Sequence, residues 1–239
     1  MTLRVAILTP FPEMVKAVIG TSILARAVER GTVEYTVVNL FDYADEPHRK
    51  IDDQPFGGGA GMIMKPEPIF RAYEAAVASA GKPPERVLFP TPDGVPFSQK
   101  IAGELAQIDE MVIISGHYKG IDQRVRDQLV TDEISIGDFV VTGGEIPGLL
   151  MLDAIVRLRE GSLNTSESAA TDSFSAALLD GPHYTRPRNY RGAEVPEVLL
   201  SGDHGRIADW RQAKREEQTR KRRPDLWERY EAAGLNRQK

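Results

Sequence analysis

The sequence predicts an α/β domain on a mostly parallel sheet, followed by a small helical domain. Three observations lead to this prediction. Apolar, strand-like runs alternate with helical windows through the first two-thirds of the chain, which is the pattern of parallel α/β sheets. Turns rich in glycine and proline directly follow several of these runs. Beyond residue 172 the character changes to charged helical stretches that carry large aromatic residues.

The composition is that of an ordinary globular protein. The 239 residues suffice for one large or two modest domains, and 41% of them are hydrophobic. Cysteine is absent, which excludes disulfides and thiolate chemistry, and the four histidines lack the spacing of metal ligands. The apolar run before Glu13 is too short for a signal peptide, and no later run approaches membrane-spanning length. We therefore expect a cytosolic protein.

The net charge of −5 hides an uneven distribution. Residues 203–239 carry 11 Lys and Arg against 7 Asp and Glu, a balance of +4. Subtraction from the totals of 30 and 35 leaves 19 against 28, or −9, for residues 1–202. A basic tail on an acidic body favours contact of the tail with a polyanion.

The strand-like runs and helical windows alternate in order along the chain. The predicted strands are Arg4–Leu8, Glu34–Asn39, Arg86–Phe89, Met111–Ile114 and Glu133–Ile136. The predicted helices are Pro12–Arg30, Pro66–Ala80, Gln99–Ala106 and Pro147–Arg157. The first strand leads into TPFPEM, not into a glycine-rich turn, so an ordinary dinucleotide-binding domain is a poor match.

A long connection, His48–Met64 (HRKIDDQPFGGGAGMIM), follows the second strand. Loops of this length are usually functional or disordered, and Phe56, Met62 and Met64 give this one apolar side chains for packing. Gly57–Gly61 lacks the Lys-Ser/Thr ending of a P-loop, so it is a weak match for a phosphate site. Close backbone approach at an interface or over a bound base is at least as good an interpretation.

The stretch Ser135–Leu150 (SIGDFVVTGGEIPGLL) predicts a strand that stops at Gly143-Gly144 and a helix that starts after Pro147. A strand that ends in this way exposes backbone N–H and C=O groups beyond the sheet edge. By itself the stretch fits a ligand site and a plain strand-to-helix connection equally well.

Two further turns favour the ligand site. Phe89–Gly94 (FPTPDG) and Gly116–Gly120 (GHYKG) also follow strand-like runs. Three turns at the ends of adjacent parallel strands converge on one crevice, where ligands bind in open α/β sheets. His117 lies in the second turn, but a lone histidine in a turn is more often hydrogen-bonded or exposed than catalytic.

Six blocks of sequence, in order and covering nearly the whole chain, carry a family resemblance: LTPFPEM, HRKIDDQPFGGGAGMIM, SGHYKGIDQR, SIGDFVVTGGEIP, DSFSAALLDGPHYTRP and RRPDL. Together they resemble the bacterial tRNA (guanine-N1-)-methyltransferases, which modify position 37 beside the anticodon and so maintain the reading frame. That family belongs to the SPOUT class. The resemblance implies a deep trefoil knot around S-adenosyl-L-methionine, which sequence pattern alone does not predict because knots are rare.

The resemblance implies that the three turns form the methyl-donor pocket. Its assigned residues are Phe89, Pro90, Thr91 and Pro92 in one wall, Gly116 and Tyr118 in the second, and Ile136, Gly137, Phe139, Val141, Gly143, Gly144 and Pro147 in the third. Lys119 departs from the family pattern, because many relatives carry glutamate there. The role of that carboxylate, including help with Mg²⁺, is therefore not carried over, and Mg²⁺ stays an open second cofactor.

Methyl transfer to N1 of guanine requires a base, since N1 carries a proton at neutral pH, and a group that stabilises negative charge developing toward O6. The resemblance assigns these roles to Asp172 and Arg157. The residues alone also fit structural roles. Asp172 precedes SFSAALL as a helix N-cap would, and an arginine in a last helical turn complements the helix dipole.

Three domain segments follow from these assignments. Residues 1–160 are predicted to form the knotted methyltransferase domain and residues 172–239 a helical tRNA-binding domain. Between them, residues 161–171 (GSLNTSESAAT) have the composition of a flexible linker. A linker just before the base suggests a segment that orders when tRNA binds and completes the site by induced fit.

The last segment offers cations and aromatic residues. Tyr184–Pro187 and Arg220–Arg223 (RKRR) carry the cations, while Trp210, Trp227 and Tyr230 are better explained as the core of a small helical domain than as base-stacking platforms. The basic run fits either a solvated face or phosphate contact. The family's use of this domain to clamp tRNA favours phosphate contact.

The resemblance also implies a homodimer whose active sites are shared between subunits. The loop Gly57–Met64 with its neighbour Phe56 is suited to packing against a twofold partner, and the linker would let Asp172 reach the partner's pocket. Two alternatives remain: a knotted but inactive RNA-binding protein, and a related methyltransferase that acts on ribosomal RNA. Intact Asp172 and Arg157 argue against the first, and the helical tail argues against the second.

Overall fold

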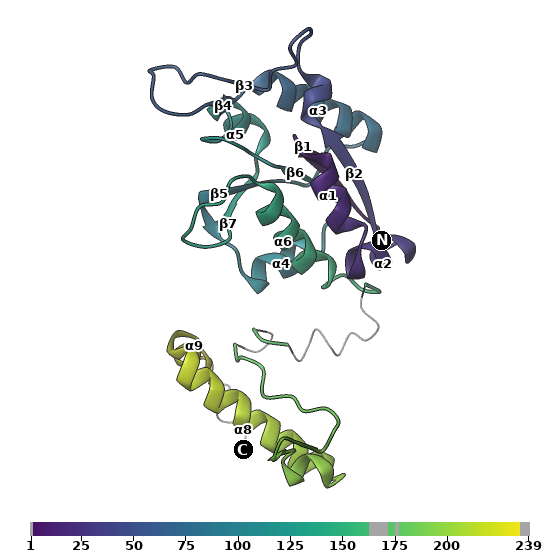
Figure 1. Ribbon diagram of the computed structural model, residues 1–239, viewed down its shortest axis with the longest axis vertical. Coiled ribbons are helices and arrows are strands. Elements are labelled where there is room, and N and C mark those ends of the chain that lie inside the picture. The colour runs from purple at the N-terminus through teal and green to yellow at the C-terminus, as the bar shows by residue number, and fades with distance from the viewer. Residues whose placement is uncertain (1, 163–171, 175–176, 235–239) are drawn as a thin grey trace. The chain divides into compact units, whose positions relative to one another are not determined.

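The structure is a computed structural model that describes residues 2–162, 172–174 and 177–234. The chain divides into two compact units, residues 1–164 and 165–239. In Figure 1 the first unit runs from purple to green and the second from green to yellow. The predicted linker falls at this division, and its residues 163–171 lie outside the described residues.

The first unit is built on a five-stranded sheet. Its strands, in the order β2-β1-β6-β5-β7, are Val33–Asn39, Leu3–Thr9, Glu110–Ile114, Arg86–Pro96 and Asp132–Ser135. Every neighbouring pair is parallel, which confirms the predicted α/β class. Successive side chains of a strand point to opposite faces, and all five residues of β6 are buried. Both faces of the sheet are therefore covered, as parallel sheets require.

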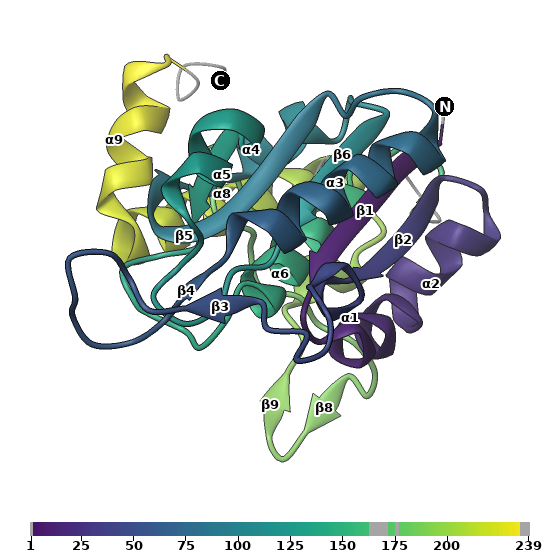
Figure 2. The same ribbon diagram turned by 90° about the horizontal axis from the view of Figure 1, so that it is seen from above.

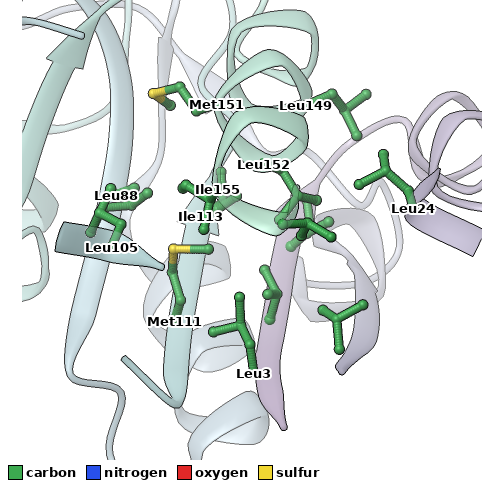
Figure 3. Packing of buried hydrophobic residues seen from close by; sticks show 14 of the residues in the cluster. Leu3, Leu24, Leu88, Leu105, Met111, Ile113, Leu149, Met151, Leu152 and Ile155 are labelled. Carbon is green, nitrogen blue, oxygen red and sulfur yellow. The ribbon is translucent and has the colours of Figure 1, made fainter. Parts of the chain in front are cut away.

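Four helices cover one face: α1 (Pro12–Ile19), α2 (Ser22–Glu29), α4 (Gln99–Leu105) and α6 (Glu145–Val156). Figure 3 shows Leu152 and Ile155 of α6 lying over Ile113 of β6 in this core. The sequence of α6, EIPGLLMLDAIV, is apolar nearly all round, which is typical of a buried helix. The core thereby fixes α6 across the sheet.

The opposite face is covered by α3 (Pro66–Ala80) and α5 (Gln123–Leu129), with the short helix η1 (Leu40–Tyr43) beside them. The glycine-rich connection forms a small antiparallel pair, β3 (Asp52–Asp53) and β4 (Ile63–Met64), and Figure 1 shows the loop between these strands extending outward. Met64 is buried in the core of this face, while Phe56 at the loop is fully exposed. The predicted packing of the loop is thus confirmed within this chain for Met64, while Phe56 makes no such contact here and its predicted packing against a partner stays a prediction.

Several predicted elements differ in their ends. The window 12–30 is two helices, because Gly20 caps α1 and Ser22 has a φ of 55° at the start of α2. α5 was not predicted, since only Val125 of its seven residues is buried and no apolar period marks it. α6 begins at Glu145, two residues before Pro147, because the first turn of a helix does not use its N–H groups and tolerates proline.

The run 139–142 is a loop and not the predicted strand. β7 ends at Ser135, and Gly137, at a φ of 144°, turns the chain away from the sheet. Phe139 and Val140 are exposed. The β-branched residues of this run therefore line a loop beside the sheet edge, where no neighbouring strand pairs with them in the described part of the chain.

The second unit contains α8 (His204–Arg222), α9 (Pro224–Ala232), the short helix η2 (Glu197–Leu200) and the hairpin strands β8 (Asn189–Tyr190) and β9 (Ala193–Glu194). Leu178, Trp227 and Tyr230 form its buried cluster. The expected core role is confirmed for these two aromatic residues, while Trp210 is half-buried beside Tyr184. No described helix in either unit combines the length and apolarity needed to cross a membrane.

Candidate active site

A pocket of about 200 Å³ lies at the carboxyl ends of three adjacent strands, β6, β5 and β7. All the residues that the family resemblance assigns to the methyl donor line it: Phe89, Pro90, Thr91, Pro92, Gly116, Tyr118, Ile136, Gly137, Phe139, Val141, Gly143, Gly144 and Pro147. The predicted convergence of the three turns on one crevice is confirmed. Seven further residues line the pocket: six that lie in the predicted turn and stretch but had no assigned role (His117, Lys119, Gly120, Ser135, Val140 and Thr142), and Ile134, which was not predicted there.

The first wall is a bulge in β5. Pairing between β5 and β7 breaks after Pro90 and resumes at Val95, so the residues between them loop out over the sheet edge. Arg126 of α5 anchors this bulge by donating hydrogen bonds to Asp93 (2.7 Å) and Glu133 (2.5 Å). Hydrogen bonds from the Thr91 hydroxyl and from Arg126 hold the pKa of the Asp93 carboxyl below its usual value.

The second and third walls are joined through their backbones. Gly144 N donates to Gly116 O at 2.8 Å, and His117 pairs with Gly143 in an isolated antiparallel bridge. A Cβ atom on Gly144 would lie 2.8 Å from Gly116 N, and one on Gly143 would lie 2.2 Å from His117 Cε1. Close approach between the walls therefore demands glycine at these positions.

A buried hydrogen-bonded network lies beneath these glycines. The Glu145 side chain is only 2% exposed. Its carboxylate accepts a hydrogen bond from Thr9 Oγ1 at 2.7 Å, and it lies 2.6 Å from His117 Nε2. Glu145 opens α6, where the helix dipole favours a carboxylate. His117 is thus hydrogen-bonded, in agreement with the plainer interpretation of the sequence.

This network ties together the ends of β1 and β6 and the start of α6, which lie far apart in the sequence. The sequence contains two signals for this network: a threonine at the end of the first strand, and a glutamate directly after the paired glycines. Neither signal identifies its partner, because the contacts span 136 and 28 residues.

The second wall also meets the glycine-rich loop. Lys119 N donates to Met62 O at 3.0 Å, and a Cβ on Gly61 would lie 2.8 Å from Lys119 Cγ. Tyr118 has a φ of 61°, a conformation that residues other than glycine rarely adopt and that is often found at functional sites. Burial, with a smaller effect of the Asp52 charge, raises the pKa of the Tyr118 hydroxyl.

Arg157, one of the two predicted catalytic residues, is not among the residues that line this pocket. Arg157 is the C-cap of α6, whose first turn contributes Pro147 to the pocket. Arg157 follows Pro147 by ten positions, which correspond to about 15 Å along the helix axis. Asp172 belongs to the second unit. Phe174 has a φ of 74°, so no helix begins at Asp172 and its alternative role as an N-cap is wrong.

The described residues do not fit a resident metal ion. Within the ranges described, no group of three or more His, Asp or Glu side chains comes together to hold one. Lys119 adds a cation, not a ligand, to the pocket.

The basic run of the second unit is partly occupied by internal contacts. The guanidinium of Arg220 lies 4.3 Å from the centre of the Trp227 ring. Arg223 forms an ion pair with Asp225 at 2.6 Å. Lys221 and Arg222, both exposed, are thus the members of the run that are best suited to contact a ligand.

Comparison with known proteins agrees with the resemblance. The family model described as tRNA (Guanine-1)-methyltransferase TrmD matches residues 3–229. A tRNA (guanine-N(1)-)-methyltransferase from Brevibacillus brevis is 50% identical over 226 residues, which cover 95% of this chain and 92% of the relative. The corresponding proteins of Bacillus subtilis (49% over 224 residues, covering 94% and 92%) and Moorella thermoacetica (50% over 226 residues, covering 94% and 90%) are similar throughout. The chain therefore belongs to the tRNA (guanine-N1-)-methyltransferase family.

Proposed function

We propose that this protein transfers a methyl group from S-adenosyl-L-methionine to N1 of the guanine at position 37 of tRNA, beside the anticodon, and so maintains the reading frame. The observation that carries this proposal is the convergence of all the assigned donor-binding residues on one pocket, in a chain that matches the family over nearly its full length. A SPOUT-type knot through this region, with the donor bound in a bent shape, is part of the proposal.

The pocket suits the methyl donor chemically. Gly116, Gly143 and Gly144 let two walls of the pocket approach closely, since a Cβ at any of them would collide with neighbouring protein atoms. Backbone N–H and C=O groups of the lining turns can recognise the edge of an adenine ring, while apolar residues such as Phe89 and Ile136 can sandwich its faces. The bound donor supplies an electrophilic methyl group.

The remaining chemistry falls to Asp172 and Arg157. Asp172 would accept the N1 proton of guanine as the general base. Arg157 would stabilise the negative charge that develops toward O6 as the proton leaves.

A homodimer with shared active sites accounts for the position of Arg157. Since about 15 Å of helix separates Arg157 from its own pocket, its action on a guanine beside the donor is easier to explain in a partner's pocket. The surface offers a means of pairing. Apolar side chains stand exposed on two helices that contact each other, α1 and α6, and also on the β3–β4 loop: Met14, Val18, Ile146, Leu150 and Phe56.

The test is methyl transfer to a defined substrate. We expect the protein, given S-adenosyl-L-methionine, to methylate a tRNA transcript with guanine at position 37 and to leave a transcript with adenine there unmodified. Mapping of the product should find the methyl group on N1 of that guanine. Tight tRNA binding without transfer would favour the inactive RNA-binding alternative, and transfer to ribosomal RNA alone would favour the related enzyme.

A further inference from the structure

The β8–β9 hairpin presents a cationic and aromatic surface that the family assignments leave without a role. Residues 183–194 are all exposed, and Figure 2 shows the hairpin as two short arrows joined by a tight turn. The segment 184–194 (YTRPRNYRGAE) contains three arginines and one glutamate. The only carboxylate, Glu194, already accepts a hydrogen bond from Asn189 Nδ2 at 3.2 Å.

The turn of this hairpin holds Arg191 in a strained conformation. Tyr190 pairs with Ala193, so the loop consists of Arg191 and Gly192, with φ angles of 54° and 83°. Positive φ at both positions is the requirement of a type I′ turn, which strongly favours Asn-Gly. Arginine at the first position is unfavourable for the backbone. Asn189 Oδ1 nevertheless braces the turn by accepting from Gly192 N at 3.2 Å.

The strained arginine is paired with an exposed aromatic ring. The Arg191 guanidinium lies 5.2 Å from the centre of the Tyr190 ring, and Tyr190 is 61% exposed. A guanidinium on one face of a ring leaves the other face for a planar ligand. The same guanidinium can hold an anion through its planar set of donors.

Unpaired RNA bases match both features. A base taken out of its stack can lie on a tyrosine ring, and the phosphate next to it can accept hydrogen bonds from arginine. Paired bases in a stem do not offer a free face. Strained residues that persist in exposed turns are often found at functional sites, which gives the arginine a reason to occupy a position suited to asparagine.

We propose that the β8–β9 hairpin contacts the tRNA, stacking one unpaired base on Tyr190 and holding an adjacent phosphate with Arg191. This inference rests on the proposed function, because it takes tRNA as the substrate. It adds a contact at a defined element that neither the family match nor the pocket assigns.

The conformation of Arg191 allows a test that separates stability from binding. Arg191→Asn creates the preferred Asn-Gly turn, so the melting temperature should stay the same or rise. Binding of a labelled tRNA transcript, measured by fluorescence anisotropy at several salt concentrations, should weaken. The slope of log affinity against log salt concentration should become shallower by about the contribution of one phosphate contact. Tyr190→Leu should weaken binding roughly tenfold without changing the salt dependence.

A matched control is Arg49→Asn in the first unit. Arg49 is also exposed and has a φ of 44°, but it is engaged with Glu46 at 2.7 Å. This variant removes the same charge and relieves similar strain, and it should bind tRNA like the wild type. An equal loss in both asparagine variants would reduce the effect to overall charge and overturn the proposal.

Nuclease footprinting identifies the contacted nucleotide. We expect the wild-type protein to protect an unpaired nucleotide of the tRNA from the nuclease. In the complex with the Tyr190→Leu variant, the nuclease should cleave at this nucleotide. If the wild type binds and methylates tRNA while either hairpin variant matches it in affinity, or if the footprint changes only in stems, the hairpin proposal is wrong and the proposed function stands. If the wild type neither binds nor methylates tRNA, the proposed function itself fails.

Discussion

Glu145 illustrates how single residues hold the pocket in shape. A carboxylate that leaves water must regain its hydrogen bonds inside the protein, and here the partners are Thr9 and His117. The His117 ring in turn lies against Gly143 and packs beside the Phe11 ring, with ring centroids 4.9 Å apart and ring planes at 58° to each other. A change at Glu145 is thus transmitted directly to a wall of the pocket.

We predict that Glu145→Ala weakens both the fold and the donor site. Loss of the carboxylate leaves the buried Thr9 hydroxyl without an acceptor, so the free energy of unfolding should fall by about 1–3 kcal/mol. Calorimetric affinity for S-adenosyl-L-methionine should fall as well, because the His117–Gly143 contact is released. Glu13→Ala, at an exposed glutamate of α1, is the control and should change stability by less than about 0.5 kcal/mol. If Glu145→Ala and Glu13→Ala had the same stability and the same donor affinity, the buried network would not support the pocket.

Asp172 supports a second prediction at the residue scale. Asp172→Asn keeps the size of the side chain and removes most of its proton affinity. The turnover number should fall by about a hundred- to ten-thousandfold, the usual contribution of a general base, while calorimetric binding of the donor is unchanged. Near-normal turnover would show that another group removes the N1 proton.

At the scale of elements, the basic end of α8 separates into two kinds of residue. All four residues of the run are exposed, but Arg220 contacts the Trp227 ring and Arg223 forms an ion pair with Asp225 inside the second unit. The sequence presents all four as one run. The structure therefore refines the expectation of phosphate contact.

We predict that the double variant Lys221→Ala, Arg222→Ala weakens tRNA binding and makes it less salt-sensitive, with the methylated base unchanged. Arg220→Ala should instead lower the melting temperature, because the contact with Trp227 is lost. Binding isotherms at a series of salt concentrations distinguish the two. If the salt dependence of tRNA binding were unchanged in the double variant, Lys221 and Arg222 would belong to a solvated face that does not contact phosphate.

The elements also explain which parts of the fold the sequence could predict. The apolar periods of β1, β6 and α3 carry their own signal, and α3 begins and ends at the predicted residues 66 and 80. α5 has no such period, and the run 139–142 has a β-like composition but pairs with no strand among the described residues. The turns of the pocket could be predicted because glycine and proline mark them. The Thr9–Glu145–His117 network could not, because its partners are brought together only by the sheet.

In the whole molecule, we propose that the pocket of one chain works with Asp172 of another. The pocket lies in the first unit and Asp172 in the second, and Arg157 lies a helix length away from its own pocket. The exposed apolar residues of α1 and α6 provide a surface on which two chains could pair. A dimer would therefore be required for activity and not only for stability.

Mixing two inactive variants tests this claim most directly. Gly143→Val should abolish donor binding, since a side chain there collides with His117, and it should leave circular dichroism largely intact. Asp172→Asn should remove the base and leave the pocket whole. When the two proteins are mixed and allowed to exchange subunits, each mixed dimer should hold one intact pocket facing one intact Asp172. Methyl transfer should return to about a quarter of the wild-type rate, because half of the dimers are mixed and each has one competent site. Mass measurement of the mixed dimer shows whether subunits have exchanged. If they have exchanged and no methyl group is transferred, the active sites are not shared, and each pocket uses the base of its own chain.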